Sequence, residues 1–382
     1  MKLAVVASHP VQYYAPLFRE LSSQIDLVVF YAHNPSPQQQ SDAGFGTAFE
    51  WDVDLLSGYN FHFLINKSSK PNTSAFRGCD TPEVGSHLVR EKFDAVLVMG
   101  WHLMCFWQAL IACKLHGIPI LVRGDSQLST PRRPLWNTAK EYVYPHLLRL
   151  FDGILYVGAN NKEYLDHYRY PPERQFYSPH CVDVDWFRKH AGSTVRAAMR
   201  SSLGIPEGFV NILFAGRLVE FKRPGDVLLA ASLLQKHIPV CVTIAGSGEL
   251  EESLKELAQR HSLRIHYLGF CNQSQMPAVY ACADVLVLPS SGRETWGLVC
   301  NEALACGTPI VVSDEVGCAP DVMTFDKIAK NFPIGDVDAL AEAIWSVSRD
   351  GRKEELFTEA NEKFSPKSAS TGVIKAVRSV SR

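Results

Sequence analysis

Backbone amides at the start of one helix are the groups of this chain best suited to bind an anion. The stretch that begins at Ser290 reads SSGRETWGLVCNEALACGTP, follows an apolar strand, and predicts a helix that ends at Gly307. The amides of Gly297, Leu298 and Val299 then lie at a helix start without intrahelical partners. Such amides, with the positive end of the helix dipole, form a site for a phosphate group.

Two carboxylates flank this predicted site. Glu294 precedes the helix, and Glu302 lies five residues inside it, roughly 7 to 8 Å farther along the axis. A diphosphate at the helix start would then have one acid near its sugar end and one near its ribose end. The alternative is that Glu302 faces solvent and that Glu294 only favours the helix dipole.

Two cations follow the first strand of the second half of the chain. Arg217 and Lys222 come directly after the apolar run 210–215. A nucleotide diphosphate needs cations to hold it and to stabilise the charge that grows when its bond to a sugar breaks. Taken alone, both residues also suit a solvated surface; their place after a strand favours a binding role.

The elements that position these residues alternate between β-branched strands and helices. Strands that are apolar on both faces belong to parallel sheets covered by helices on both sides. The sequence therefore predicts an α/β fold of two Rossmann-like, doubly wound domains that face each other across a cleft. The predicted strands are 3–7, 27–31, 95–99, 118–122 and 153–157 in the first domain, and 210–215, 240–245, 264–268, 284–288 and 309–313 in the second.

The domain boundary falls in the interval 177–208, which separates the two series of strands. We expect an N-terminal domain over 1–190 and a C-terminal domain over 191–365. A last helix, 366–382, should pack back toward the N-terminal domain.

Composition and charge exclude several classes of protein. The 382 residues are 46% hydrophobic. Their formal net charge is −2, so the chain has no overall positive field to bind nucleic acid. Its ten cysteines form no C-x-x-C pair, which suits a reducing compartment. The first residues are too short an apolar run for a signal peptide, so we expect a cytoplasmic protein. The uncharged stretch 95–113 is interpreted as a buried strand and helix, not as a membrane span.

Four motifs together resemble the retaining glycosyltransferases of family 4, which have the GT-B fold. They are Gly216-Arg217-x4-Lys222, the turn AGSG from Ala245, LGF from Leu268, and Glu294-x7-Glu302 followed by ALACGTP. A more distant likeness is to bacterial glycosyltransferases of surface polysaccharides.

The resemblance implies that the C-terminal domain binds the nucleotide-sugar and the N-terminal domain binds the acceptor, and it implies a role for each donor-site residue. Arg217 and Lys222 would bind the donor diphosphate, and Glu294 would contact hydroxyls of the donor sugar. Glu302 would hold the ribose hydroxyls. The amides of Gly297, Leu298 and Val299 would bind phosphate or sugar, and the backbone near Phe270 and Cys271 would meet the base. In this family the leaving phosphate oxygen is commonly held to take the acceptor's proton, so no enzymic nucleophile, cofactor or essential metal is expected.

The N-terminal domain departs from the family pattern. Its first loop reads SHPVQYYAP from Ser8 where many members have glycines, and Arg123-Gly-Asp-Ser stands where the family often has an active-site histidine. We rank Asp125 first, His9 second and His102 third for the acceptor site. The predicted catalytic residues of the whole chain are thus Glu294 with Asp125 and His9.

Three D-x-D patterns, which begin at Asp52, Asp183 and Asp336, could in principle bind a divalent cation. Asp183 falls in the interdomain linker, and Asp336 reads as the start of a helix. We therefore predict no metal site, because Arg217 and Lys222 can supply the positive charge.

The resulting prediction is an enzyme that moves a sugar from a nucleotide donor to a hydroxyl of a glycan or lipid-linked acceptor. The basic and aromatic segment 130–152 leaves peripheral contact with the inner face of the membrane open. Two other functions also stay open: a sugar-nucleotide epimerase or hydrolase, and a binding protein without catalysis.

Overall fold

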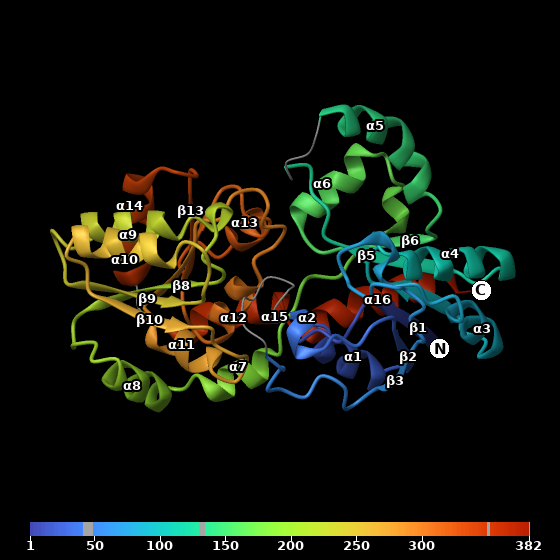
Figure 1. The fold of residues 1–382 in the computed structure, drawn as a ribbon, viewed down its shortest axis with the longest axis horizontal. Helices are drawn as coiled ribbons and strands as arrows, with labels where there is room; N and C mark the ends of the chain where they lie inside the picture. The colour runs from blue at the N-terminus through green and yellow to red at the C-terminus, as the bar shows by residue number, and fades with distance from the viewer. Residues whose placement is uncertain (41–48, 130–133, 350–351, 382) are drawn as a thin grey trace. The chain divides into compact units, whose positions relative to one another are not determined.

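The computed structural model of this chain describes residues 1–40, 49–129, 134–349 and 352–381, and the side chains of these except 40 and 134–139. The chain forms two compact units (Figure 1). Unit 1 comprises Met1–Gln39, Val53–Cys181 and Pro366–Arg382, and unit 2 comprises Gln40–Asp52 and Val182–Ser365. Each unit is a parallel sheet with helices on both faces, which confirms the predicted fold class.

Unit 1 is built on a seven-stranded parallel sheet of order β3-β2-β1-β4-β5-β6-β7. Its strands are β1 (Lys2–Ala7), β2 (Asp26–Tyr31), β3 (Asn60–Phe63), β4 (Ala95–Val98), β5 (Ile120–Gly124), β6 (Gly153–Tyr156) and β7 (Gln175–Tyr177). Its helices are α1 (Ala15–Ser22), α2 (Pro37–Gln40), α3 (Val84–Arg90), α4 (Met104–His116), α5 (Pro134–Leu148), α6 (Ala159–His167) and α16 (Pro366–Val380), with short 3-10 turns at Phe76–Gly78 and Pro172–Arg174.

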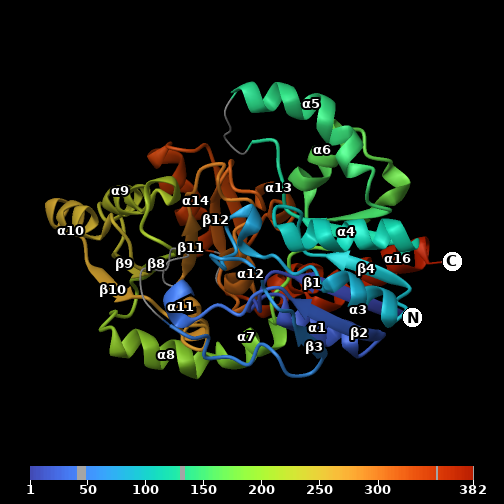
Figure 2. The same ribbon diagram turned by 45° about the vertical axis from the view of Figure 1, so that its right-hand side comes forward.

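Alternate residues of β1 face the two cores of unit 1. Ala4 and Val6 pack with residues of α3, α4 and α6, whereas Leu3 and Val5 pack with residues of α1 and α16 (Figure 2). All four side chains are fully buried. Burial on both faces explains why the central strands are apolar throughout and could be recognised in the sequence.

Unit 2 is built on a six-stranded parallel sheet of order β10-β9-β8-β11-β12-β13. Its strands are β8 (Val210–Ala215), β9 (Val240–Ala245), β10 (Ile265–Gly269), β11 (Val285–Leu288), β12 (Ile310–Ser313) and β13 (Ala329–Phe332). Its helices are α7 (Val184–His190), α8 (Ser193–Ser202), α9 (Pro224–Leu234), α10 (Glu251–Arg260), α11 (Met276–Cys282), α12 (Leu298–Ala305), α13 (Ala319–Val322), α14 (Val337–Arg349) and α15 (Thr358–Lys363), with 3-10 turns η4 (Glu220–Lys222) and η5 (Glu354–Phe357).

Helices α9, α10 and α14 cover one face of this sheet, and α8, α11 and α12 lie on the other side (Figure 1). Helix α10 shows how the sequence produces this packing. Leu254 and Ala258, four residues apart, are buried against the sheet, while Glu252 and Lys255 lie off this stripe and pair on the surface at 2.7 Å.

The strand order reverses between β8 and β11, which are neighbours in the sheet although two strands separate them in the chain. Loops at the carboxyl ends of strands diverge at such a switch point and leave room for a ligand. Arg217 and Lys222 follow β8, and Gly297 follows β11. The sheet order therefore places the predicted cations and the predicted helix start after the carboxyl ends of two neighbouring strands.

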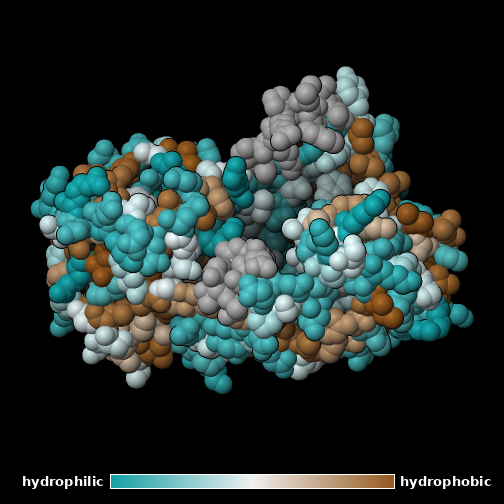
Figure 3. All heavy atoms as spheres, in the orientation of Figure 1, coloured by the Kyte–Doolittle hydropathy of each residue, from teal (hydrophilic) through white to brown (hydrophobic). Residues whose placement is uncertain are grey.

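The stretch 95–113 forms β4 and most of α4, which ends at Gly117 in a left-handed conformation, φ 66°. Within the described residues no helix is both long and apolar enough to cross a bilayer. The surface in Figure 3 shows apolar residues in small groups between hydrophilic ones.

Candidate functional site

The loop after β8 brings both predicted cations to one aromatic ring. Arg217 is exposed, and its guanidinium carbon lies 6.0 Å from the ring centre of Phe221. The Lys222 ammonium lies 5.6 Å from the same ring and forms an ion pair with Glu294. A ligand phosphate at this loop would therefore meet two positive charges, of which one is shared with a carboxylate.

Glycines allow the β9 loop to lie directly against the β8 loop. A Cβ atom on Gly246 would lie 1.9 Å from the carbonyl oxygen of Gly216, and one on Gly248 would lie 2.4 Å from that of Leu218. Both glycines have positive φ angles, which other residues rarely adopt. The Leu218 amide donates to the Ser247 carbonyl at 2.9 Å, so the two loops form one continuous floor.

The start of α12 has the geometry expected of an anion site. Gly297 precedes the helix with φ 95°, and a Cβ atom there would lie 2.5 Å from Cδ2 of Leu288. Gly297 has no side chain that could cap the helix. Across the described part of the chain, no side chain accepts a hydrogen bond from the amides of Leu298 or Val299, so both can point at an anion.

Glu294 is held by its backbone on both sides. Its amide donates to Ser291 at 3.0 Å, and its carbonyl accepts from Gly317 at 2.9 Å. Ser291 in turn donates to the Phe221 carbonyl at 2.8 Å, which links the loop before α12 to the loop after β8. The carboxylate can thus remain beside Lys222, with its side chain only 16% exposed.

Glu302 is buried, not exposed to solvent. It is 8% exposed and accepts a hydrogen bond from the Tyr280 hydroxyl at 2.6 Å and a long one from Gln273 at 3.5 Å. Burial raises the pKa of Glu302 to about 7, although both hydrogen bonds favour the charged form. A buried carboxylate with a raised pKa is a candidate binding or catalytic residue.

Phe270 and Cys271 follow β10 at the same edge of the sheet. The Gly246 amide donates to the Gly269 carbonyl at 2.7 Å, so this loop continues the floor formed by the loops after β8 and β9. The Phe270 ring lies 4.6 Å from that of Phe49, centre to centre, at 43°. The predicted base-binding residues are therefore next to an aromatic ring from a distant part of the sequence.

In unit 1, His9 and Asp125 follow β1 and β5. His9 contacts Ser8, with Oγ and Nδ1 2.9 Å apart, and burial, aided by His33, lowers the pKa of His9 to about 4. The imidazole is therefore neutral at pH 7. The Asp125 side chain is 46% exposed, and one of its oxygens lies 3.9 Å from Nε2 of His180.

Three residues that sequence reasoning did not place in this cluster accompany Asp125. His180 is buried and contacts the ring of Tyr13 edge-on at 6.1 Å. The buried Arg123 guanidinium donates to the carbonyls of Ser178 and Pro179, the latter at 2.8 Å. The loop after β1 and the segment before Val182 thus meet Asp125. From the sequence alone, the only indication was that these segments follow strands.

His102 lies apart from this cluster. It is exposed, and its Nε2 lies 3.3 Å from the Thr73 carbonyl oxygen. Two of the D-x-D patterns have structural roles: Asp183 accepts from the Trp186 amide at 3.1 Å, and Asp336 accepts from the Ala339 amide at 2.9 Å. The described residues contain no group of three potential metal ligands.

The basic and aromatic segment 130–152, for which membrane contact stays open, is described only in part. Arg132 and Arg133 lie outside the described residues. Lys140 is buried and lies 4.7 Å from the ring centre of Tyr144, while Tyr142 is 76% exposed.

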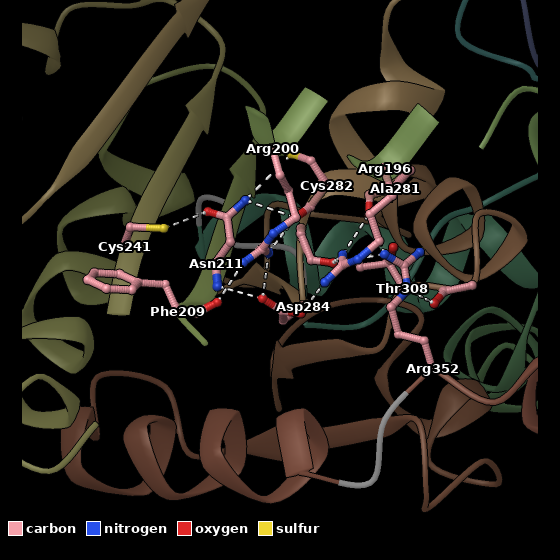
Figure 4. Close-up of polar contacts among 12 residues, drawn as sticks. Arg196, Arg200, Phe209, Asn211, Cys241, Ala281, Cys282, Asp284, Thr308 and Arg352 are labelled. Carbon is pink, nitrogen blue, oxygen red and sulfur yellow. Dashed lines mark hydrogen bonds and ion pairs between the residues drawn. The ribbon is translucent and has the colours of Figure 1, made fainter. Parts of the chain in front are cut away.

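A cluster of arginines stabilises unit 2 near the carboxyl ends of α11 and α12. Arg196 and Arg200 of α8 bind the two oxygens of Asp284 at 2.6 and 3.0 Å (Figure 4). Arg352 donates to the carbonyls of Cys306 and Gly307, just beyond α12, and to two carbonyls at the end of α11. The guanidinium groups thus satisfy the carboxyl ends of the two helices that carry Tyr280 and Glu302.

Comparison with known proteins places this geometry in a known class. Sucrose-phosphate synthase from Thermosynechococcus elongatus superposes with a TM-score of 0.71 over 100% of this chain and 99% of its own, at 16% identity. HepE from Anabaena, crystallised with UDP, superposes with a TM-score of 0.71 over 99% of this chain and all of its own, at 14% identity. The two-sheet architecture is that of the GT-B fold.

Sequence relatives agree with this class. D-inositol 3-phosphate glycosyltransferase from Streptomyces bingchenggensis is 37% identical over 244 residues, 58% of this chain and 50% of the relative. An uncharacterised glycosyltransferase from Methanocaldococcus jannaschii is 38% identical over 122 residues, 31% of this chain and 30% of the relative. The chain thus spans half or less of the length of these relatives. Residues 195–364, which make up most of unit 2, match the family model of glycosyl transferases group 1.

Proposed function

We propose that this protein is a retaining glycosyltransferase that moves a sugar from a nucleotide-diphosphate-sugar to a hydroxyl of a glycan or lipid-linked acceptor. The observation that carries the proposal is the arrangement around the β8–β11 switch point. Lys222 pairs with Glu294 in the loop that leads to the open amides of Leu298 and Val299, and Arg217 lies over the same Phe221 ring as Lys222. Family 4 of the retaining enzymes fits the family match and the spacing from Arg217 to Glu302.

The proposed donor occupies unit 2 with its diphosphate between the two cations and the start of α12. The amides of Leu298 and Val299 would bind phosphate oxygens, and Lys222 would stabilise the charge that develops on the leaving phosphate. Glu294, fixed beside Lys222, would accept hydrogen bonds from sugar hydroxyls. The structures of HepE with UDP support a nucleotide ligand for this fold.

Glu302 would accept hydrogen bonds from the ribose hydroxyls, and the loop at Phe270 and Cys271 would contact the base. Both groups lie on the same edge of the sheet as the cations, because all strands of unit 2 are parallel. We propose no cofactor and no essential metal, since Arg217 and Lys222 supply the positive charge that a divalent cation would bring.

The proposed transfer breaks the bond between the anomeric carbon and the phosphate oxygen and forms one to the acceptor oxygen. The acceptor's proton passes to the leaving phosphate, so no covalent enzyme intermediate is needed. Asp125 and His9 are proposed to contact the acceptor; the neutral imidazole of His9 can act as a hydrogen-bond donor or acceptor. A role in polysaccharide or glycoconjugate synthesis follows from the acceptor class. The ten free cysteines support a reducing compartment such as the cytoplasm.

The first test is a thermal-shift screen with UDP-, GDP- and ADP-sugars, followed by an assay for an acceptor-dependent glycosylated product. A native-state ligand raises the melting temperature. We expect Lys222→Ala to lower kcat/KM for the donor by about 100-fold, as removal of a charge-stabilising donor does elsewhere. Lys255→Ala, which changes an exposed lysine of α10, is the matched control and should leave turnover unchanged.

The proposal fails if no nucleotide shifts the melting temperature and no acceptor-dependent product forms. Conversion of the donor without an acceptor would instead indicate an epimerase or hydrolase. Activity in EDTA equal to that in added Mg²⁺ is expected, and strict dependence on a divalent cation would remove the proposed electrostatic role of the two cations.

A further inference from the structure

A short segment from the N-terminal half of the sequence is part of unit 2. The chain leaves unit 1 after Gln39 and returns to it at Val53, and Gln40–Asp52 belongs to unit 2. Of this excursion, the side chains of residues 49–52 are described. We call these four residues the 49–52 segment.

Aromatic packing joins the 49–52 segment to the loop after β10. Phe49 is 8% exposed, and its ring lies 4.6 Å from that of Phe270 and 4.9 Å from that of Trp51, the second at 90°. Such tilted and edge-on pairs are favourable beyond the area that they bury. Phe49 is therefore a packing partner of the loop that is proposed to meet the nucleotide base.

Hydrogen bonds fix the same loop at three points. The Asn272 side-chain amide donates to the Glu50 carbonyl at 2.7 Å. The Ser274 backbone amide donates to Oδ1 of Asp52 at 3.0 Å, and the Ser274 hydroxyl donates to Oδ2. One carboxylate thus accepts two bonds from one residue, which fixes both the position and the orientation of the loop.

The residue between these anchor points reaches the donor site. Gln273 lies between Asn272 and Ser274 and donates to Oε1 of Glu302 at 3.5 Å. The Gln273 backbone amide donates to Oδ1 of Asn272 at 2.8 Å, which restricts the loop backbone at this residue. The 49–52 segment therefore holds the two residues that flank Gln273, which in turn contacts the proposed ribose-binding carboxylate.

The two acids of the first D-x-D pattern have different partners. Asp52 binds Ser274, whereas Asp54 accepts from the amides of Leu56 and Ser57 at 2.9 and 3.0 Å. The side chains of the pair thus serve two separate loops, and Asp54 provides a matched control two residues from Asp52.

We propose that the 49–52 segment is a positioning element of the donor site: Asp52 and Phe49 hold the 270–274 loop where it can receive the nucleoside of the donor. This inference rests on the proposed function. Its consequence is that donor affinity and the choice of base depend on residues in the first sixth of the chain, although the donor itself would lie in unit 2.

The test compares Asp52→Asn and Phe49→Ala with Asp54→Asn in the full chain. Hydrogen exchange of the 270–275 amides should be at least fivefold faster in the first two variants than in the wild type. The Kd of the nucleotide that gives the largest thermal shift, and the donor KM, should rise about five- to tenfold, with kcat changed less than twofold. In these two variants the ratio of the Kd values for UDP and GDP should move toward one. A general loss of stability would not change this ratio.

Ser274→Ala is a milder variant for use if Asp52→Asn does not fold. It should raise the donor KM about twofold to threefold, and Ser274→Thr should restore it. Equal exchange, equal Kd and equal base preference in Asp52→Asn, Phe49→Ala and the wild type would overturn the inference while the transferase activity stands. If the wild type neither binds a nucleotide nor transfers a sugar, the proposed function fails and this inference fails with it.

Discussion

Replacement of Glu302 by glutamine should stabilise the protein and weaken donor binding at the same time. The carboxylate is buried, and burial raises its pKa from 4.5 to about 7. Above pH 7 the folded protein must therefore hold a poorly solvated charge. Glutamine has the same shape and no charge, and its amide oxygen can still accept from Tyr280.

The size of the effect depends on pH because the pKa differs between the folded and unfolded states. The pKa of Glu302 is higher in the folded state than in the unfolded state, so protonation of this side chain favours folding. The stability that the protonated form contributes is complete below pH 4.5 and is lost as the pH rises through 7. Relative to a neutral side chain, the carboxylate costs about 1 kcal/mol at pH 5 and about 3 kcal/mol at pH 8. Glu302→Gln should regain most of this difference.

Melting curves at pH 5 and pH 8 measure the stability, with Glu359→Gln, an exposed glutamate of α15, as the control. We expect the melting temperature of Glu302→Gln to exceed that of the wild type by about 5 °C or more at pH 8 and much less at pH 5. Nucleotide Kd should rise at least tenfold at pH 8, and wild-type affinity should fall as the pH drops below 7 because the ionised carboxylate accepts the ribose hydroxyls.

Two results would refute this reasoning separately. An equal stability difference between Glu302→Gln and the wild type at both pH values would show that burial does not raise the pKa. An unchanged nucleotide Kd in a stabilised variant would show that Glu302 lies outside the donor site.

Two further substitutions separate binding from stability. Gly297→Ala should lower the free energy of unfolding by at least about 1–2 kcal/mol and raise the nucleotide Kd more than tenfold, because the φ of Gly297 is positive and a Cβ there would clash with Leu288. Gly307→Ala, also at a positive φ, is the control and should reduce only the melting temperature. Arg352→Met should lower stability by about 2–4 kcal/mol in denaturant titrations, since it removes four hydrogen bonds and leaves the carbonyls of Cys306 and Gly307 without this donor, while those of Ala281 and Ala283 keep Arg196; the nucleotide Kd should change less than twofold. A tenfold change in that Kd would mean that the carboxyl ends of α11 and α12 control the site.

The sequence was most informative about strands that are buried on both faces. The central runs such as 210–215 and 240–245 coincide with β8 and β9, because burial on both sides demands apolar residues without interruption. The edge strand β10 was predicted over 264–268, but the edge strands β3, β7 and β13 were not. They are three or four residues long and partly exposed, so they carry polar residues such as Asn60 and Lys330 and give no continuous apolar signal.

The site itself was predictable where function depends on the backbone. Gly297 could be placed from its position between a strand and a helix. The Tyr280 contact with Glu302 and the Asp52 contact with Ser274 could not, because each joins residues far apart in the sequence. Arg196 and Arg200 left a partial signal, since their spacing of four puts both on one helix face and suggests a shared partner.

Helix α16 has a consequence for how the protein is made. Its residues Ala369, Val373 and Val377 are fully buried in the same core as Leu3 and Val5 of β1. On a ribosome, the N-terminal sheet would keep part of one apolar face uncovered beside α1 until some 360 residues had been synthesised, whereas the stretch 182–365 could complete its own sheet earlier. The part of the molecule translated first is thus the part that matures last, and a nascent chain stalled before Pro366 would be a natural client for a chaperone.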